Sequence, residues 1–221
     1  ERLLVDEDRV EIIPNGVDLE RIDAFTETGL AIRDRFEIPS EAFLVGTAAV
    51  ISRQKGLDVF VKGVDRANEQ VAQPIHAVIA GDGSHRGEIE SLTSYLGIEN
   101  RIHFTGMVDR NTVYRLLGEL DLYAMPSRWE GFSMAAVEAL GSATPCLFSD
   151  IDPLLKPYRN VARFHAVDDT TEFTEQLVTL IEAPELREVY GQSGRELVES
   201  RYTLAEIAQR YATLYDEVVA Q

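Results

Sequence analysis

The sequence has little cysteine and lysine, and it lacks the positive charge to balance its many acidic residues. Its single cysteine, Cys146, lies in an apolar segment, so we expect a buried structural thiol and neither a disulfide framework nor a thiolate metal site. The four histidines lack the spacing of metal ligands, so no metal site is predicted. The formal net charge of −17 argues against nucleic acid and anionic membranes as partners, although it permits a local phosphate site.

Long apolar runs are also missing. No segment approaches the ~20 apolar residues of a membrane-spanning helix, and no signal peptide opens the sequence. We therefore expect a cytoplasmic protein with no membrane contact from this part of the chain. A hydrophobic content of 45% is typical of a globular domain, and 221 residues are enough to bury a sizeable core.

Apolar runs alternate with segments of helical periodicity, and several runs end in glycine or polar residues. A continuous apolar run is typical of a strand that is buried on both faces of a sheet. The predicted strands are 10–13, 43–51, 76–80, 101–105, 121–125, 145–148 and 163–167. The predicted helices lie within 20–36, within 150–162, and at 57–72, 88–96, 111–120 (with Asn111 as its cap), 171–182, 184–200 and 204–219, and a further short helix is predicted to begin at 133.

This order predicts an α/β fold, a Rossmann-like doubly wound parallel sheet with C-terminal helices. In such sheets, ligands bind beyond the carboxyl ends of the strands. The candidate site is therefore made of the segments 52–56, 81–83, 106–109 and 126–133.

The most informative stretch is 126–145, PSRWEGFSMAAVEALGSATP, which carries two glutamates eight positions apart. Glu130 lies in a loop after a strand, and Glu138 lies inside a helix for which Ser133 is a good N-cap residue. The unpaired amides of a helix N-terminus attract an anion. Carboxylates on either side of that anion could hold hydroxyl groups. A phosphate flanked by hydroxyl groups has the shape of a nucleotide sugar. The alternative interpretation is a surface loop and an amphipathic helix with solvated glutamates.

Several motifs together resemble glycosyltransferase family 4, the group 1 glycosyltransferases. They are IIPNGVD, a QKG loop after a buried strand, AGDGSHRGEIESL, FTGMV, AMPSRWEGFSMAAVEAL and YATLYDEV. The resemblance covers residues 10–220 and implies the C-terminal, donor-binding half of a two-domain GT-B fold. On this interpretation, residues 1–14 are a linker at the end of a missing N-terminal domain, and residues 15–221 form the nucleotide-sugar-binding domain.

The resemblance implies retaining transfer of a sugar from a nucleoside diphosphate, without a metal or another cofactor. It makes Glu130 the carboxylate beside the transferred sugar, Lys55 the cation that neutralises the diphosphate, and Glu138 the ligand of the ribose hydroxyls. The remaining implied donor contacts are Gly81, Gly83, Met107 and Val108 at the base and ribose, and Gly131, Phe132, Ser133 and Met134 at the sugar and diphosphate. Taken alone, the glycines also fit a tight turn, Met107 and Val108 fit a core, and Lys55 fits an ordinary surface.

The sequence departs from the family pattern at the phosphate-binding loop. The family usually has an arginine five residues before the lysine, where this chain has Val50. Arg53 is an alternative cation for the diphosphate. The family also commonly has a glycine at the position of Ala143 and an acidic residue within the segment that here reads DPLLKP, which leaves donor contacts from that segment open.

The second half of a GT-B enzyme, which binds the acceptor, has no counterpart in these residues. We therefore expect that the isolated domain binds a donor but transfers no sugar, and that the missing N-terminal acceptor domain acts in cis or in trans. Two alternatives remain. One is a non-catalytic nucleotide-sugar-binding or interaction domain with a degraded phosphate clamp, and the other is part of a related GT-B enzyme such as a sugar epimerase.

Overall fold

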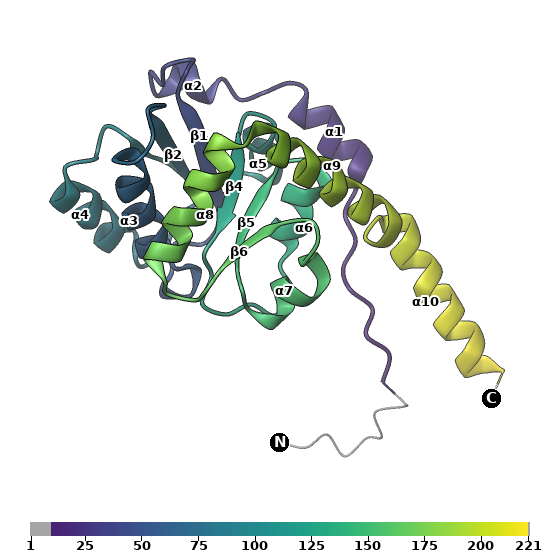
Figure 1. The fold of residues 1–221 in the computed structure, drawn as a ribbon. Helices are drawn as coiled ribbons and strands as arrows, with labels where there is room; N and C mark the ends of the chain where they lie inside the picture. Colours follow the sequence, from purple (N-terminus) through teal and green to yellow (C-terminus); the bar gives the residue numbers. More distant parts are fainter. Residues whose placement is uncertain (1–9, 221) are drawn as a thin grey trace.

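The computed structural model describes residues 10–220 as a six-stranded parallel sheet between two layers of helices (Figure 1). The strand order is β3-β2-β1-β4-β5-β6, which confirms the predicted doubly wound Rossmann-like fold. The strands are β1 (Phe43–Ala48), β2 (Ile75–Ala80), β3 (Ile102–Gly106), β4 (Leu122–Met125), β5 (Cys146–Ser149) and β6 (Arg163–His165).

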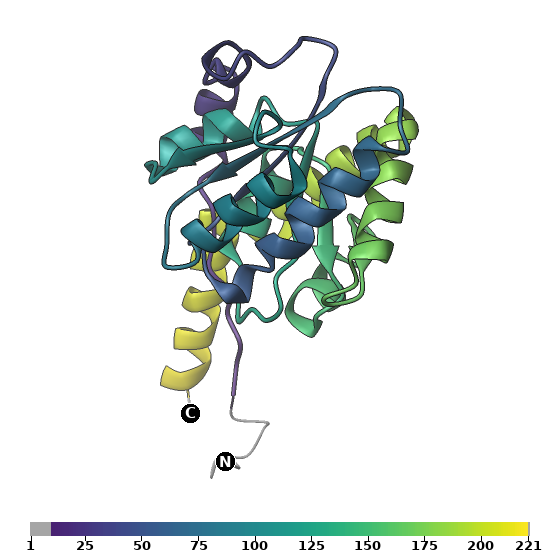
Figure 2. The same cartoon turned by 90° about the vertical axis from the view of Figure 1, so that its left-hand side faces the viewer.

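The helices follow the strands in the alternating order that a parallel sheet requires. In chain order they are α1 (Leu19–Thr26), α2 (Ile32–Arg35), the short 3-10 helix η2 (Arg53–Lys55), α3 (Leu57–Asn68), α4 (Arg86–Leu96), α5 (Arg110–Leu117), α6 (Met134–Gly141), α7 (Asp152–Tyr158), α8 (Thr170–Glu182), α9 (Pro184–Arg201) and α10 (Leu204–Val219). Figure 2 shows α3 and α4 side by side on one face of the sheet.

Each strand contributes to two cores because its side chains alternate between the faces. In β1, Leu44 packs in the cluster beneath α1, α5, α6 and α7, whereas Val45 packs in the cluster beneath α3, α4 and α8. Cys146 of β5 is fully buried, and this burial raises the pKa of its thiol well above the ordinary value. The prediction of a structural thiol is confirmed.

The structure corrects the predicted strand at 10–13, and residues 1–9 of the predicted linker lie outside the described part. Residues 10–16 form no strand and lie beside α10, where Arg210 donates to Glu11 and to the carbonyl of Ile12, and Ile12 is 79% exposed. Pairing begins at Val17, whose amide donates to the carbonyl of Tyr202 at 2.7 Å, just before α10. The apolar residues at 10–13 therefore have no neighbouring strand with which to form a ladder.

Several helix boundaries also differ from the prediction, most clearly in α1 and α2 and at the start of α5. The stretch 20–36 forms two helices, α1 and α2, which are separated by a turn at Gly29 with φ +60°. The N-cap of α5 is Asp109, whose side chain accepts from the amide of Thr112 at 2.9 Å. Asn111 instead accepts hydrogen bonds from Arg21 of α1, because it already lies inside the helix.

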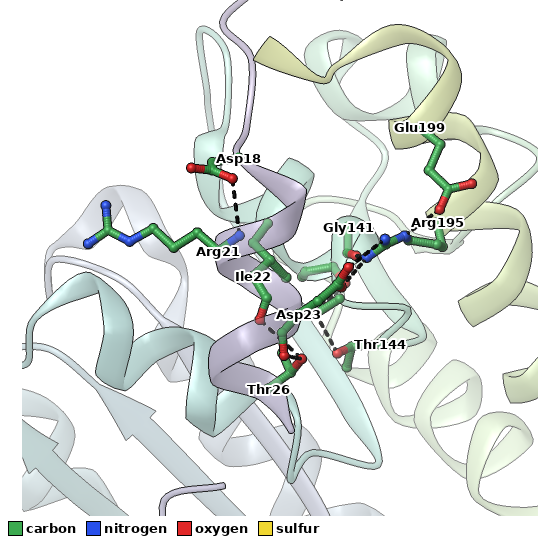
Figure 3. Close-up of polar contacts among 11 residues, drawn as sticks. Asp18, Arg21, Ile22, Asp23, Thr26, Gly141, Thr144, Arg195 and Glu199 are labelled. Atoms are coloured by element: carbon green, nitrogen blue, oxygen red, sulfur yellow. Dashed lines mark hydrogen bonds and ion pairs between the residues drawn. The ribbon is translucent and has the colours of Figure 1, made fainter. Parts of the chain in front are cut away.

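The C-terminal end of α6 is held by Arg195 of α9 (Figure 3). The Arg195 guanidinium donates to the carbonyl of Gly141 at 2.7 Å and to both carboxylate oxygens of Asp23 in α1. A cation that caps the last carbonyls of a helix also favours the negative end of the helix dipole. Three helices, α1, α6 and α9, are thereby joined at the C-terminal end of α6.

Candidate functional site

The candidate site lies where the chain direction across the sheet reverses, between β1 and β4. From β1 the chain winds outward through β2 to β3, and from β4 it winds through β5 to β6. The loops after β1 and β4 therefore leave the same sheet edge toward opposite faces and open a crevice between them. All four segments that the sequence predicts for the site lie at this carboxyl edge.

Hydrogen bonds join the loop after β1 to the loop after β4. The amide of Arg128 donates to the carbonyl of Gln54 at 2.7 Å, and the side chain of Gln54 donates to the carbonyl of Trp129 at 2.8 Å. The guanidinium of Arg128 also donates to the carbonyl of Arg53 and to the carboxylate of Asp58. These bonds hold the two loops together, and this contact between the loops is called the joint below.

Gly56 allows this close approach. Its φ is +61°, in the left-handed region, and a Cβ atom placed on it would lie 2.0 Å from the carbonyl oxygen of Pro126. Only glycine fits a position with such a φ and a backbone oxygen in that place. The conformation of Gly56 therefore sets the distance between Lys55 and the 126–133 loop.

Lys55 and Glu130, which the sequence predicts as catalytic, form an ion pair across this joint. The Nζ atom of Lys55 lies 2.6 Å from Oε1 of Glu130, and Ser127 donates to the same oxygen at 2.8 Å. The side chains are only 18% and 7% exposed, respectively. The carboxylate thus compensates the charge of the lysine.

The N-terminus of α6 opens beside this pair. Ser133 is the N-cap, as predicted, and its hydroxyl accepts from the amide of Ala136 at 3.3 Å. Within the described residues, the amides of Met134 and Ala135 make no hydrogen bond, as is usual in a first helical turn. Gly131 is exposed. The ring centroid of Phe132 lies 6.2 Å from that of Tyr202, so this loop also packs against the junction between α9 and α10.

A cavity of about 290 Å³ adjoins α6 on the side of β1, β2 and β3. Four predicted donor residues line it, namely Gly81, Met107, Val108 and Glu138. Val50, at the position of the missing family arginine, also lines the cavity and is 63% exposed. Met107 is 75% exposed, so it lies on the rim of the cavity and does not belong to the core.

Gly81 and Gly83 bring the loop after β2 against the loop after β1. Gly81 has φ +141°, and a Cβ atom on it would lie 1.9 Å from the carbonyl oxygen of Ala49. A Cβ atom on Gly83 would lie 2.3 Å from the carbonyl oxygen of Ile51. Gly83 is not among the residues that line the cavity, so its contribution is to the close packing of the loops.

Glu138 is the buried carboxylate of the cavity wall, with 6% exposure. Its Oε1 atom accepts from Nε of Arg110 at 2.6 Å and from the hydroxyl of Tyr114 at 3.1 Å. Burial, together with the adjacent carboxylate, raises the pKa of Tyr114 to about 12, so the phenol stays protonated and donates. Arg110 could not be predicted from the sequence, because its partner is 28 positions away and no local pattern connects the two.

Arg53 does not join either group. Its side chain is exposed and forms no ion pair with any residue in the range 10–220, while its carbonyl accepts from Arg128 at 2.6 Å. Within that range, no three histidine, cysteine or acidic side chains come close enough together to hold a metal ion. None of the described helices is both long enough and apolar enough to span a membrane.

Comparison with known proteins adds a family and several relatives. The sequence model of the family "Glycosyl transferases group 1" matches residues 30–197. The chain is 22% identical over 207 residues to the O-antigen biosynthesis glycosyltransferase WclY of Escherichia coli, which covers 94% of this chain and 55% of that protein. The chain thus spans about half the length of this curated relative.

Solved structures share the fold. HepE of Anabaena, in complex with UDP and glucose, superimposes with a TM-score of 0.84 at 19% identity, covering 96% of this chain and 58% of that one. The C-terminal domain of a group 1 glycosyl transferase, LpcC of Francisella tularensis, gives a TM-score of 0.72 at 21% identity, covering 86% of this chain and all of that domain. The arrangement of the described residues therefore matches one sheet domain of GT-B glycosyltransferase structures.

Proposed function

Because the chain belongs to the group 1 glycosyl transferases, we propose that its crevice binds a nucleoside diphosphate sugar and supplies the donor half of a retaining, metal-independent glycosyltransferase. The observation that carries this proposal is the position of α6. Its N-terminus lies beside the Lys55–Glu130 pair, and its second turn places Glu138 in the wall of the adjacent cavity.

The diphosphate is assigned to the N-terminus of α6. The amides of the first turn and the positive end of the helix dipole favour an anion there. Lys55 adds a full positive charge from the neighbouring loop. During transfer, negative charge builds on the leaving diphosphate, and oriented donors in a site with little water stabilise it. These groups can supply the charge compensation that a metal ion supplies in other transferases.

The two glutamates are assigned to opposite ends of the donor. Glu130 lies on the loop before α6 and is assigned to the sugar, with Gly131, Phe132, Ser133 and Met134 as neighbouring backbone contacts. Glu138 lies in the cavity and is assigned to the ribose, with Gly81, Met107 and Val108 around the base and ribose. The complex of the structural neighbour HepE with UDP and glucose supports this class of ligand.

The acceptor is assigned to a separate N-terminal domain, in cis or in trans. Relatives such as WclY are nearly twice as long as the matched region, which supports a second domain. In Figure 1, α10 extends away from the sheet, and its side chains Tyr215 and Val218 are 65% and 63% exposed. A neighbouring domain would cover them. We expect the isolated chain to bind donor without transferring its sugar.

A second candidate function is non-catalytic binding of a nucleotide sugar. Val50 favours it, because an exposed valine stands where the family usually has a phosphate-binding cation. The two functions differ in their dependence on Lys55. A donor half needs this lysine for a charged leaving group, whereas a binding domain with a degraded clamp would hold the nucleoside and tolerate its loss.

Calorimetry with two glutamate variants tests the assignments. Glu138→Gln is expected to weaken both a nucleoside diphosphate and its sugar conjugate by roughly 10- to 100-fold, because both carry the ribose. Glu130→Gln is expected to remove the preference for the conjugate and to leave the bare diphosphate bound at least as tightly, since Lys55 loses its competing partner.

Glu88→Gln, on an exposed position of α4, is the control. If Glu130→Gln weakens both ligands equally while Glu138→Gln alters only the sugar conjugate, the two roles are reversed and the proposed orientation of the donor is wrong.

A further inference from the structure

We propose that Arg110 and Tyr114 are positioning residues that hold Glu138 in the conformation in which it binds the donor ribose. The inference rests on the proposed function and adds two side chains to it. Both come from the first five residues of α5 and contact a glutamate of α6, across the wall of the cavity.

The first observation is how the carboxylate is shared. Arg110 and Tyr114 both donate to the same oxygen, Oε1, at 2.6 and 3.1 Å. An ionised carboxylate oxygen has two lone pairs, so these two donors satisfy Oε1. A carboxylate with 6% exposure needs such partners, because burying its charge without hydrogen bonds is costly.

The second observation is that the other carboxylate oxygen of Glu138, Oε2, remains available to a ligand. Within the described residues, Oε2 of Glu138 accepts no hydrogen bond, and it is not among the fully buried polar atoms without a partner. Glu138 lines the cavity, so Oε2 is the acceptor left for a ligand. Its two lone pairs match the two hydroxyl groups of a vicinal diol, such as the 2′- and 3′-hydroxyls of a ribose.

The third observation is the rigidity of the support. Tyr114 is 2% exposed and packs in the core, and α5 is capped by Asp109. Arg21 of α1 donates two hydrogen bonds to Asn111 in the first turn of α5, at 3.0 and 2.8 Å. A ligand-binding side chain held by partners on fixed helices loses little conformational freedom when the ligand arrives. Glu138 is therefore in its binding conformation before the donor enters.

The test compares ribose recognition in matched variants by calorimetry. The probes are UDP, GDP and ADP, and the tightest of them is then paired with its 2′,3′-dideoxy counterpart. The native chain is expected to prefer the ribose form by about tenfold or more, the equivalent of at least one charge-assisted hydrogen bond. In Arg110→Met and Tyr114→Phe, this preference is expected to fall to about threefold or less, while the dideoxy form binds almost as before.

Arg110→Lys, which keeps a donor, is expected to restore part of the preference. Arg66→Met and Tyr95→Phe are the controls, because both residues lie outside the cavity lining. A purely structural role would lower the melting temperature of the variants but leave the ribose preference unchanged, and that result overturns the inference. Equal weakening of the ribose and dideoxy forms also overturns it, since Arg110 would then contact another part of the ligand. If the native chain binds none of the three nucleotides, the proposed function itself fails.

Discussion

Replacing Lys55 with methionine is expected to weaken the binding of a nucleoside diphosphate by roughly 30- to 100-fold. Lys55 is the cation assigned to the diphosphate, and its charge is partly shielded from solvent. The corresponding nucleoside, which lacks phosphate, should bind the variant and the native chain equally. Calorimetry with both ligands separates the charge effect from a general loss of structure.

The same substitution leaves Glu130 buried without its cation, so the variant should also lose about 3 kcal/mol of unfolding free energy. A double variant, Lys55→Met with Glu130→Gln, removes the orphaned charge. It should regain most of the stability while binding of the diphosphate stays weak. Lys62→Met, on a partly exposed position of α3, is the control for loss of a lysine. Restored diphosphate binding in the double variant would contradict a direct role for Lys55.

Replacing Gly56 with alanine is expected to lower the unfolding free energy by about 3–5 kcal/mol, a large effect for one methyl group. Alanine is strained at φ +61°, and its Cβ atom would meet the carbonyl oxygen of Pro126 at 2.0 Å. The loops after β1 and β4 would have to separate, which would break the Lys55–Glu130 pair. Urea denaturation measures the stability. Binding of a nucleoside diphosphate by the folded fraction shows whether Lys55 and Glu130 still have their native positions.

Gly87→Ala is the matched control for this substitution. Gly87 lies in α4, and a Cβ atom on it would meet no atom within 4 Å. Alanine there should stabilise the chain by about 0.5–1 kcal/mol, through helix propensity and a less flexible unfolded state. Similar stabilities for the Gly56 and Gly87 variants would show that the two loops are free to separate, which contradicts the joint described for the site.

The sheet could be predicted from the sequence because its signals are local. The apolar run that contains β1 and the N-cap of α6 at Ser133 each follow from a few consecutive residues. The apolar residues at 10–13 gave the same local signal, but no strand lies beside them, and only the tertiary structure decides that. The cap of α5 was misassigned by two positions because Asn111 and Asp109 are both good N-cap residues.

The site was predictable as a set of strand ends but not as a set of contacts. Which loops meet depends on strand order, so the joint between Gln54 and Arg128 has no signal in either segment. The pairing of Lys55 with Glu130 spans 75 positions and that of Arg110 with Glu138 spans 28. Such distant contacts arise from the packing of whole elements, which a single sequence does not reveal.

The most direct test of metal-independent nucleotide-sugar binding is thermal unfolding of this chain with nucleotide sugars in the presence of a chelator. A uridine, guanosine or adenosine diphosphate sugar at about 100 times its dissociation constant should add about 2.7 kcal/mol of stability. For a domain of this size, that corresponds to a rise of about 5–10 °C in the melting temperature. This rise is expected without any added metal. A rise that appears only with magnesium or manganese and disappears with chelator would contradict it.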